Sequence, residues 1–117
     1  IEGTTPDQDA DPSIVHLVPT VDGCVLTLSR QAIPSAFRET PVRNVHVGLY
    51  AFTGGALKRF VQRLRGPVER AESIELMRFL EYGDRVAALA VEAGSIGVDT
   101  PEDLARVERL ISQASRA

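Results

Sequence analysis

The segment from residue 86 to residue 114 joins an apolar run to a well-marked helix start, and this junction constrains the fold most. The run Val86–Val91 is almost continuously apolar, which predicts a strand buried on both faces. Thr100 stands in a cap position, Pro101 at the first helical position and Asp103 at the third, as is typical of a helix N-terminus. One apolar stripe follows, which predicts an amphipathic helix: Leu104, Val107, Leu110, Ile111 and Ala114. A strand, a loop and a capped helix in succession favour an α/β fold.

Asp99 lies in the loop of this junction, immediately before the cap residue. Junctions of this kind are where open α/β sheets bind ligands, and a carboxylate there can bind a hard divalent cation. A carboxylate beside a helix N-terminus also stabilises the helix dipole without binding anything. The run from residue 97 to residue 104 leaves both interpretations open.

The rest of the chain contains strand and helix patterns in alternation. Three strands and then two helices are expected, in this order: 14–18, 24–29, 45–52, 56–64 and 68–82. Asp22-Gly23 separates the first two strands, which predicts a β-hairpin. Gly66-Pro67 separates the two helices. With the strand and helix described above, this order predicts a mixed α/β sheet that includes a hairpin.

Composition excludes several classes of protein. The 117 residues suit one domain or half of a larger one, and the net charge of −3 argues against non-specific binding of nucleic acid. A single cysteine, Cys24, excludes an intrachain disulfide. No apolar run approaches the ~20 residues that cross a bilayer, and no signal-peptide pattern opens the chain, so we expect a soluble, cytoplasmic protein without membrane partners. Two histidines are too few for a zinc site, and no nucleophile elbow or phosphate-binding glycine motif occurs.

Three glutamates on the helix expected at 68–82 are candidates for a binding site. Glu69, Glu72 and Glu75 recur three residues apart, so they are expected to line one face beside apolar neighbours. Like charges in such a setting repel one another unless cationic or hydroxyl-rich groups meet them. From the residues alone, a solvated surface helix explains the pattern adequately and is the favoured interpretation.

His46 and Tyr50 stand four residues apart on the expected strand 45–52, so they are expected to project on the same side. Gly48 between them leaves room for a ligand or another chain. Arg30 closes the hairpin, and a guanidinium suits a carboxylate through paired hydrogen bonds. The structural alternatives are a histidine satisfied within the fold and an arginine in a surface ion pair.

Four stretches together resemble the 3-deoxy-manno-octulosonate cytidylyltransferases, also called CMP-Kdo synthetases. The similarity runs from Asp11 to Arg109 and does not include the Gly/Arg/Lys loop with which such enzymes open. In chain order the stretches are Val21-Asp22-Gly23 through Leu28-Ser29-Arg30 to Ala32-Ile33-Pro34; residues 45–52; residues 67–75 with Arg78 and Leu80; and residues 97–104.

The resemblance implies a fold, a reaction and a set of site residues. The fold would be the C-terminal half of a nucleotide-diphospho-sugar-transferase-like, Rossmann-like mixed sheet. Residues 1–12 would be a disordered or linker start, and 13–117 the half that binds the sugar acid and dimerises. The whole protein would transfer CMP from CTP to a Kdo-like sugar acid and release pyrophosphate, with Mg²⁺ as cofactor, as a homodimer. This chain would be inactive alone. The implied substrate-binding residues are Arg30, His46, Tyr50, Glu72 and Glu75, and Asp99 would be a metal ligand.

One position departs from the family. Members usually follow Leu-Glu with Gln, whereas here Ile74-Glu75 is followed by Leu76. The acceptor could therefore be a different acid, such as an amino-sugar acid or a phosphonate. A third possibility is a non-catalytic remnant that serves dimerisation.

Overall fold

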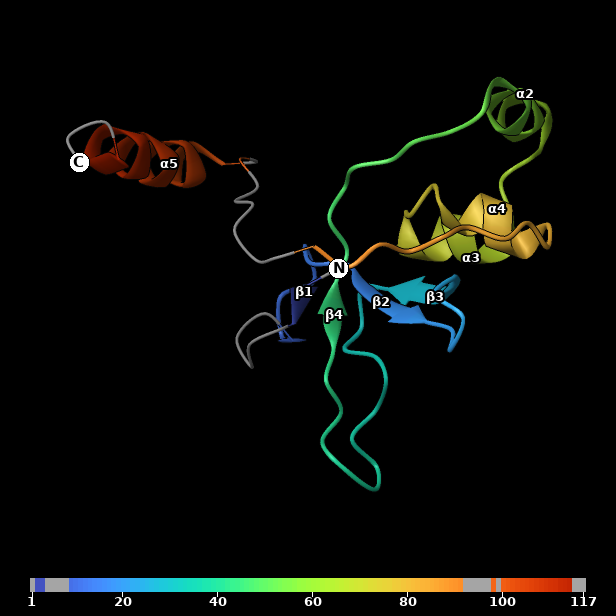
Figure 1. The fold of residues 1–117 in the computed structure, drawn as a ribbon, viewed down its shortest axis with the longest axis horizontal. Coiled ribbons are helices and arrows are strands. Elements are labelled where there is room, and N and C mark those ends of the chain that lie inside the picture. Colours follow the sequence, from blue (N-terminus) through green and yellow to red (C-terminus); the bar gives the residue numbers. More distant parts are fainter. Residues whose placement is uncertain (1, 4–8, 92–97, 99, 115–117) are drawn as a thin grey trace.

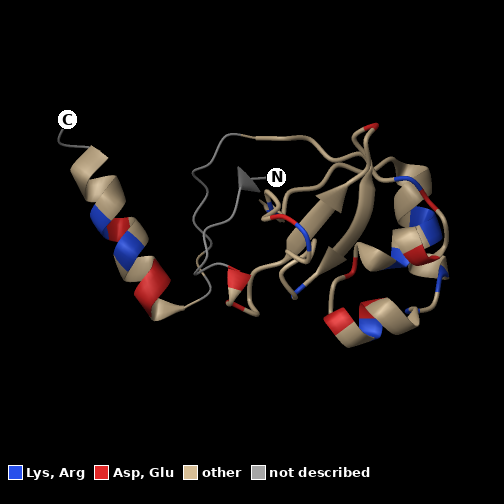
Figure 2. Ribbon diagram, turned by 90° about the horizontal axis from the view of Figure 1, so that it is seen from below, with Lys and Arg blue, Asp and Glu red and all other residues tan. Residues whose placement is uncertain are grey.

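The computed structural model describes residues 2–3, 9–91, 98 and 100–114. Its sheet has four strands in the order β1 (Glu2–Gly3), β4 (Asn44–Val45), β2 (His16–Pro19) and β3 (Val25–Ser29). All pairings within this sheet are antiparallel (Figure 1). The hairpin strands β2 and β3 carry no Lys, Arg, Asp or Glu, and Figure 2 shows the charged residues gathered on the helices and loops around them.

The predicted hairpin is confirmed. Strands β2 and β3 pair with Leu17 opposite Leu28, and the turn between them has Gly23 at φ +79°, a backbone conformation that favours glycine. The Thr20 hydroxyl accepts a hydrogen bond from the Cys24 backbone N–H at 2.9 Å and so closes the turn. The residues that specify this turn therefore all lie within the consecutive stretch 20–24.

Two predicted helices are also present. The helix expected at 56–64 is α2, Gly54–Gln62, whose first turn is capped by the Thr53 hydroxyl at 3.2 Å from the Ala56 backbone nitrogen. The C-terminal helix is α5, Pro101–Ala114. Its predicted capping box is confirmed, because Asp103 N–H donates to the Thr100 hydroxyl at 3.2 Å and Thr100 N–H donates to the Asp103 carboxylate at 3.0 Å. None of the described helices is long and apolar enough to cross a membrane.

The prediction of a single helix at 68–82 is wrong. It is two short helices, α3 (Pro67–Glu72) and α4 (Met77–Glu81), separated by a turn in which Ser73 has a left-handed conformation with φ 54°. Because of this turn, four apolar side chains that one straight helix could not direct to the same side are buried against the hairpin. They are Ile74, Leu76, Met77 and Phe79. The three glutamates consequently do not share a face. Glu69 is buried, Glu72 is half-buried and Glu75 is exposed.

Two predicted strands are largely absent. Beyond Val45, the segment 46–52 pairs with no strand among the described residues, and it bends where the Leu49 N–H donates to the Val47 carbonyl at 2.7 Å. A bond that spans two residues is typical of a γ-turn, which interrupts a strand. The run Val86–Val91 forms one bridge, between Cys24 and Ala87; only Val86 and Ala88 are half-buried and the other four residues are exposed, so the run is not buried on both faces. An apolar sequence predicts extended backbone but cannot supply the neighbouring strand.

The core lies between the hairpin, the turn that precedes α4, and α4 itself. It is small, and its buried apolar residues are Leu17, Val25, Leu28, Ile74, Leu76, Met77 and Phe79. Helix α4 packs against β3, while none of the described residues of α5 is buried, and Figures 1 and 2 both show α5 apart from the rest.

A buried ion pair links α3 to α4. The Glu69 carboxylate, 2% exposed, accepts hydrogen bonds from Arg78 Nε at 2.7 Å and Nη2 at 2.5 Å. The Arg78 guanidinium also lies 3.9 Å from the centre of the Phe60 ring, which ties it to α2. The hydrogen bond from Arg78 holds the pKa of Glu69 below its usual 4.5.

Replacing Glu69 with alanine should lower the free energy of unfolding by about 2 kcal/mol, the scale of hydrogen bonds between charged groups. Urea unfolding at pH 7 measures this. Because the folded pKa is depressed, the contribution is complete above the unfolded value of 4.5 and is lost as pH falls through the folded pKa. The gap between the native chain and Glu69→Ala should therefore narrow below about pH 4.5. Glu39→Ala, at an exposed position in the loop between β3 and β4, is the control and should cost little. A pH-independent gap would contradict the assignment.

Candidate functional site

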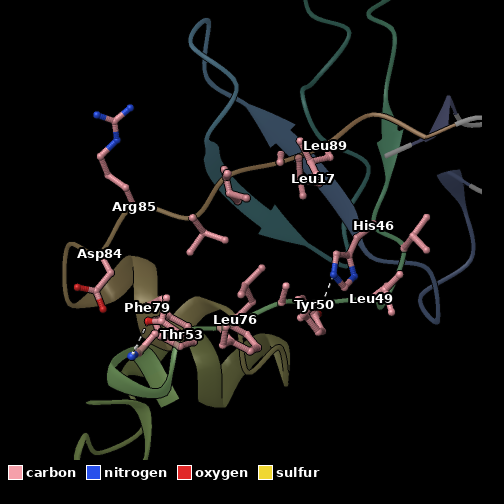
Figure 3. A pocket seen from close by; sticks show the side chains of 18 of the residues that line it. Leu17, His46, Leu49, Tyr50, Thr53, Leu76, Phe79, Asp84, Arg85 and Leu89 are labelled. Atoms are coloured by element: carbon pink, nitrogen blue, oxygen red, sulfur yellow. Dashed lines mark hydrogen bonds between the residues drawn. The ribbon is translucent and has the colours of Figure 1, made fainter. Parts of the chain in front are cut away.

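A cleft of about 580 Å³ lies between the hairpin, the segment 46–53, helix α4 and the segment 84–91 (Figure 3). Its walls are mostly apolar, with Leu17, Leu76 and Phe79 among them. Polar side chains stand at two places along it. His46 and Tyr50 are at one end, while Asp84 and Arg85 are at the other.

His46 and Tyr50 form a hydrogen-bonded pair, with 2.7 Å between the Tyr50 hydroxyl oxygen and His46 Nε2. Four residues of straight strand would separate them by about 13 Å, so the bend at Val47 and Leu49 is what brings them together. A Cβ added at Gly48 would meet no atom within 4 Å, so the predicted room beside this residue is present.

Burial sets the protonation states of this pair. It lowers the pKa of His46 below 6.5, so the imidazole is neutral at pH 7 and can accept the hydrogen of the Tyr50 hydroxyl. Burial, and then the charge of Glu75, raises the pKa of Tyr50 above 10, so the phenol keeps its proton. The pair therefore offers neutral hydrogen-bonding groups.

Glu75 belongs to the same region. The charge of its carboxylate contributes to raising the pKa of Tyr50, and its side chain is exposed while its neighbours Ile74 and Leu76 are buried. Two of the predicted site residues, His46 and Tyr50, are thus brought together in a cleft that Leu76 also lines, while Glu75 does not line the cleft and acts on Tyr50 through its charge.

A run of stacked rings holds this end of the cleft in place, and sequence reasoning did not find it. Tyr50 stacks on Phe52 with 5.7 Å between ring centres, Phe52 on Phe79 at 5.3 Å, and Phe79 on Phe60 at 5.4 Å. The rings come from the segment 46–53, α4 and α2. Only the spacing of Tyr50 and Phe52 was a possible signal in the sequence, because the other pairs are distant in the chain.

Arg30 and Glu72 lie away from the cleft lining, at the end of β3. All three nitrogens of the Arg30 guanidinium donate to backbone carbonyls, including those of Glu72 at 2.7 Å and Ser73 at 3.3 Å. The Glu72 carboxylate accepts from the Ser29 hydroxyl at 2.7 Å and from the Arg30 backbone N–H at 2.9 Å. These two residues clamp the helices to the hairpin. Their predicted contact with substrate stays a prediction.

The opposite end of the cleft holds paired charges, which sequence reasoning also missed: Arg59 pairs with Asp84, and Arg85 pairs with Asp22. Arg59 and Arg85 line it together with Asp84. Arg63 pairs closely with Asp84, and its hydrogen bond is the main reason that the pKa of this carboxyl is lowered. Arg59 belongs to α2, Arg63 is the C-cap of α2, and Arg85 lies in the segment after α4. Tertiary packing is therefore what brings these arginines together.

The proposed metal ligand, Asp99, falls outside the described residues. Among the residues that are described, no group of three or more His, Cys, Asp or Glu side chains could hold a metal ion. The role of Asp99 therefore stays a prediction, although the capped helix that follows it is confirmed.

Comparison with known proteins identifies the class. No protein-family model matches the chain. It is 41% identical to a 3-deoxy-manno-octulosonate cytidylyltransferase of Chlorobium luteolum over 92% of this chain and 43% of the relative. The corresponding enzyme of Chlamydia pneumoniae is 40% identical over 82% of this chain and 38% of its own length. A solved CMP:2-keto-3-deoxy-manno-octonic acid synthetase in complex with CTP has a TM-score of 0.91 and 32% identity, covering 97% of this chain and 47% of that one.

These relatives are by name nucleotidyltransferases of the cytidylyltransferase type, and both fold and sequence relate the chain to that class of protein. The chain belongs to the 3-deoxy-manno-octulosonate cytidylyltransferase family, and it spans less than half the length of the curated relatives it matches. The predicted resemblance is confirmed, and so is an α/β fold of the CMP-Kdo synthetase kind. The Rossmann-like arrangement of the complete sheet and the division of the chain at residue 12 stay predictions.

The neutral state of His46 can be measured directly. NMR titration of its imidazole should give a pKa below the ordinary 6.5, because burial opposes the charged form. The same chain unfolded in denaturant is the control and should titrate at about 6.5. A folded value at or above that of the unfolded chain would contradict the pocket geometry.

Proposed function

We propose that this chain forms the acceptor side of an enzyme that transfers CMP from CTP to a Kdo-like sugar acid and releases pyrophosphate. The hydrogen-bonded pair of His46 and Tyr50 on the wall of the cleft, beside the charge of Glu75, carries the proposal. Membership of the family supports it. The chain alone is expected to be inactive, since the nucleotide-binding half of the reaction would depend on polypeptide that it does not contain.

The end of the cleft near His46 suits a polyhydroxylated acid. A neutral imidazole, a protonated phenol and a carboxylate can each hydrogen-bond a sugar hydroxyl, as donor or acceptor. Leu76 and Phe79 offer an apolar wall for the C–H face of the sugar. Such contacts would orient the anomeric hydroxyl without ionising it.

Reaction then requires in-line attack by that hydroxyl on the α-phosphate of CTP. Most of the rate enhancement in such a transfer comes from positioning and from neutralising charge. Mg²⁺ would supply the charge neutralisation when bound, with Asp99 as one ligand. We also propose that the whole protein is a homodimer, as the family resemblance implies.

In this proposal, Arg30 and Glu72 hold other residues of the site in position. Their bonds to one another and to Ser73 fix the turn that precedes Glu75 and Leu76. A guanidinium still suits the carboxylate of an acid substrate. We therefore propose that Arg30 and Glu72 also contact the substrate, in addition to clamping the helices to the hairpin.

A second candidate is the same transfer to a different acid, and Leu76 favours it. This side chain is 5% exposed and lines the cleft, so an acceptor hydroxyl that faced it would lose its hydrogen bonds to water without replacement. An amino-sugar acid or a phosphonate could present a different face there. Assaying pyrophosphate release with a panel of acids decides between the two candidates, and binding of an acid without any turnover would favour a non-catalytic role.

Replacing His46 with alanine should weaken use of the acid and leave use of CTP nearly unchanged. The enzyme for this test is the joined protein, in which this chain is fused to the unmatched part of the Chlorobium luteolum relative. Loss of one hydrogen bond, about 1 kcal/mol, should raise the KM for the acid roughly fivefold. Val61→Ala, on the exposed face of α2, is the control. A rise in the KM for CTP alone would refute the assignment.

Replacing Asp99 with asparagine should nearly abolish turnover by the joined protein and leave its fold intact. Asparagine keeps the size of the side chain but loses the charge that a hard cation requires. A purely structural role at the helix start predicts a loss of about 0.3–1 kcal/mol in stability with activity preserved. Melting temperature and rate, measured across a Mg²⁺ titration, separate the two roles. A normal rate at low Mg²⁺ would remove Asp99 from the metal site.

A further inference from the structure

Phe52 connects the half-exposed ring of Tyr50 to the core. The Tyr50 side chain is 44% exposed, whereas Phe79 is buried at 4%. Phe52 lies between the two, with its ring centre 5.7 Å from that of Tyr50 and 5.3 Å from that of Phe79. The planes of the Phe52 and Phe79 rings are within 14° of parallel, which is the geometry of a stacked pair. Phe52 therefore holds the Tyr50 ring to a buried anchor.

The hydrogen bond between Tyr50 and His46 has a direction, and the acidity of the two groups determines it. A phenol is a much stronger acid than a neutral imidazole N–H, so the Tyr50 hydroxyl donates and His46 Nε2 accepts across the 2.7 Å between them. Burial lowers the pKa of His46, and burial and the charge of Glu75 raise the pKa of Tyr50, so both groups are in the required neutral forms. An imidazole that accepts at Nε2 carries its hydrogen on Nδ1.

The second ring nitrogen of His46 is the one left for a ligand. His46 lines the cleft (Figure 3), and its Nδ1 has no hydrogen-bond partner among the residues that the structure describes. With its hydrogen in place, Nδ1 can bind only an atom that has a lone pair, such as a hydroxyl, carboxylate or phosphonate oxygen. An ammonium group has no lone pair. The tautomer of His46 therefore determines which group of an acid can bind this nitrogen.

We propose that Phe52 is a positioning residue that, through Tyr50, fixes His46 as the Nδ1–H tautomer and so makes it a hydrogen-bond donor to an oxygen of the acid. The stack holds the phenol in place, and the phenol donates to Nε2. Without Phe52, the Tyr50 side chain can turn toward solvent, and both tautomers of His46 become accessible. The contact with the acid rests on the proposed function, whereas the tautomer does not.

Nitrogen NMR of the labelled imidazoles, without any acid present, tests the tautomer in the chain and in the joined protein. At about pH 8, His46 should carry its hydrogen on Nδ1. Tyr50→Phe keeps the ring and removes the hydroxyl, so it should lower the ratio of the Nδ1–H form to the Nε2–H form about fivefold, the equivalent of one hydrogen bond. Phe52→Leu should lower the ratio in the same direction. Phe52→Tyr keeps a stacking ring and should keep the native ratio.

The second histidine of the chain is an internal control. His16 is fully buried in β2, and its Nε2 lies 3.3 Å from the Asp9 carboxylate, an acceptor, so this nitrogen carries a hydrogen. Its signals should stay in place in every variant, which shows that the hairpin is intact. Phe37→Leu makes the same change at a ring that is 85% exposed and should leave His46 unchanged. If Phe52→Leu disturbs the His16 signals, Phe52→Met replaces it.

Kinetics of the joined protein test the contact with the acid. Phe52→Leu should raise the KM for the acid several-fold and leave kcat and the KM for CTP nearly unchanged. An Nε2–H form in the native protein, or a native ratio in Tyr50→Phe or Phe52→Leu, would overturn the inference whether or not the protein is active. An unchanged KM for an acid that the joined protein does use would overturn it as well. The expected tautomers without use of any acid would instead count against the proposed function.

Discussion

The clamp between Glu72 and the end of the hairpin is the interaction on which the geometry of the cleft depends. The carboxylate binds the Ser29 hydroxyl and the Arg30 backbone N–H, and the Arg30 side chain returns bonds to the carbonyls of Glu72 and Ser73. These bonds join positions more than forty residues apart and stop α3 where it meets the hairpin. The left-handed turn at Ser73 follows, and both Leu76, just before α4, and Phe79 within α4 line the cleft.

The sequence predicts those parts of the fold whose causes are local. The hairpin depends on Gly23 and the capped helices on Thr53, Thr100 and Asp103, each acting within four residues of its partner. The break at Ser73 has its cause in the clamp to β3, so no helical pattern could reveal it. Apolar alternation in 46–52 and 86–91 likewise predicts extended backbone, but a strand also requires a neighbour, which the described residues provide only in part.

In the candidate site, too, the sequence predicts what has a local cause and not what depends on tertiary packing. The sequence identified His46 and Tyr50 as a pair, although the contact arises from a bend and not from the straight strand that was expected. It could not identify the stacked rings of Phe52, Phe79 and Phe60, because they come from three segments. These rings fix the position of Tyr50, so the hydrogen-bonding pair depends on packing that no local motif records.

Leu76 connects the hydrophobic core with the candidate binding cleft, because its side chain is part of both. It is buried with Met77 and Phe79 against the hairpin, and it also forms part of the cleft wall beside His46 and Tyr50. A polar residue at this position would have to be satisfied by the ligand or by the cleft, since the core around it offers apolar neighbours. A leucine needs no such partner and stabilises the empty cleft. The same side chain that strengthens the core therefore restricts which face an acceptor can turn toward it.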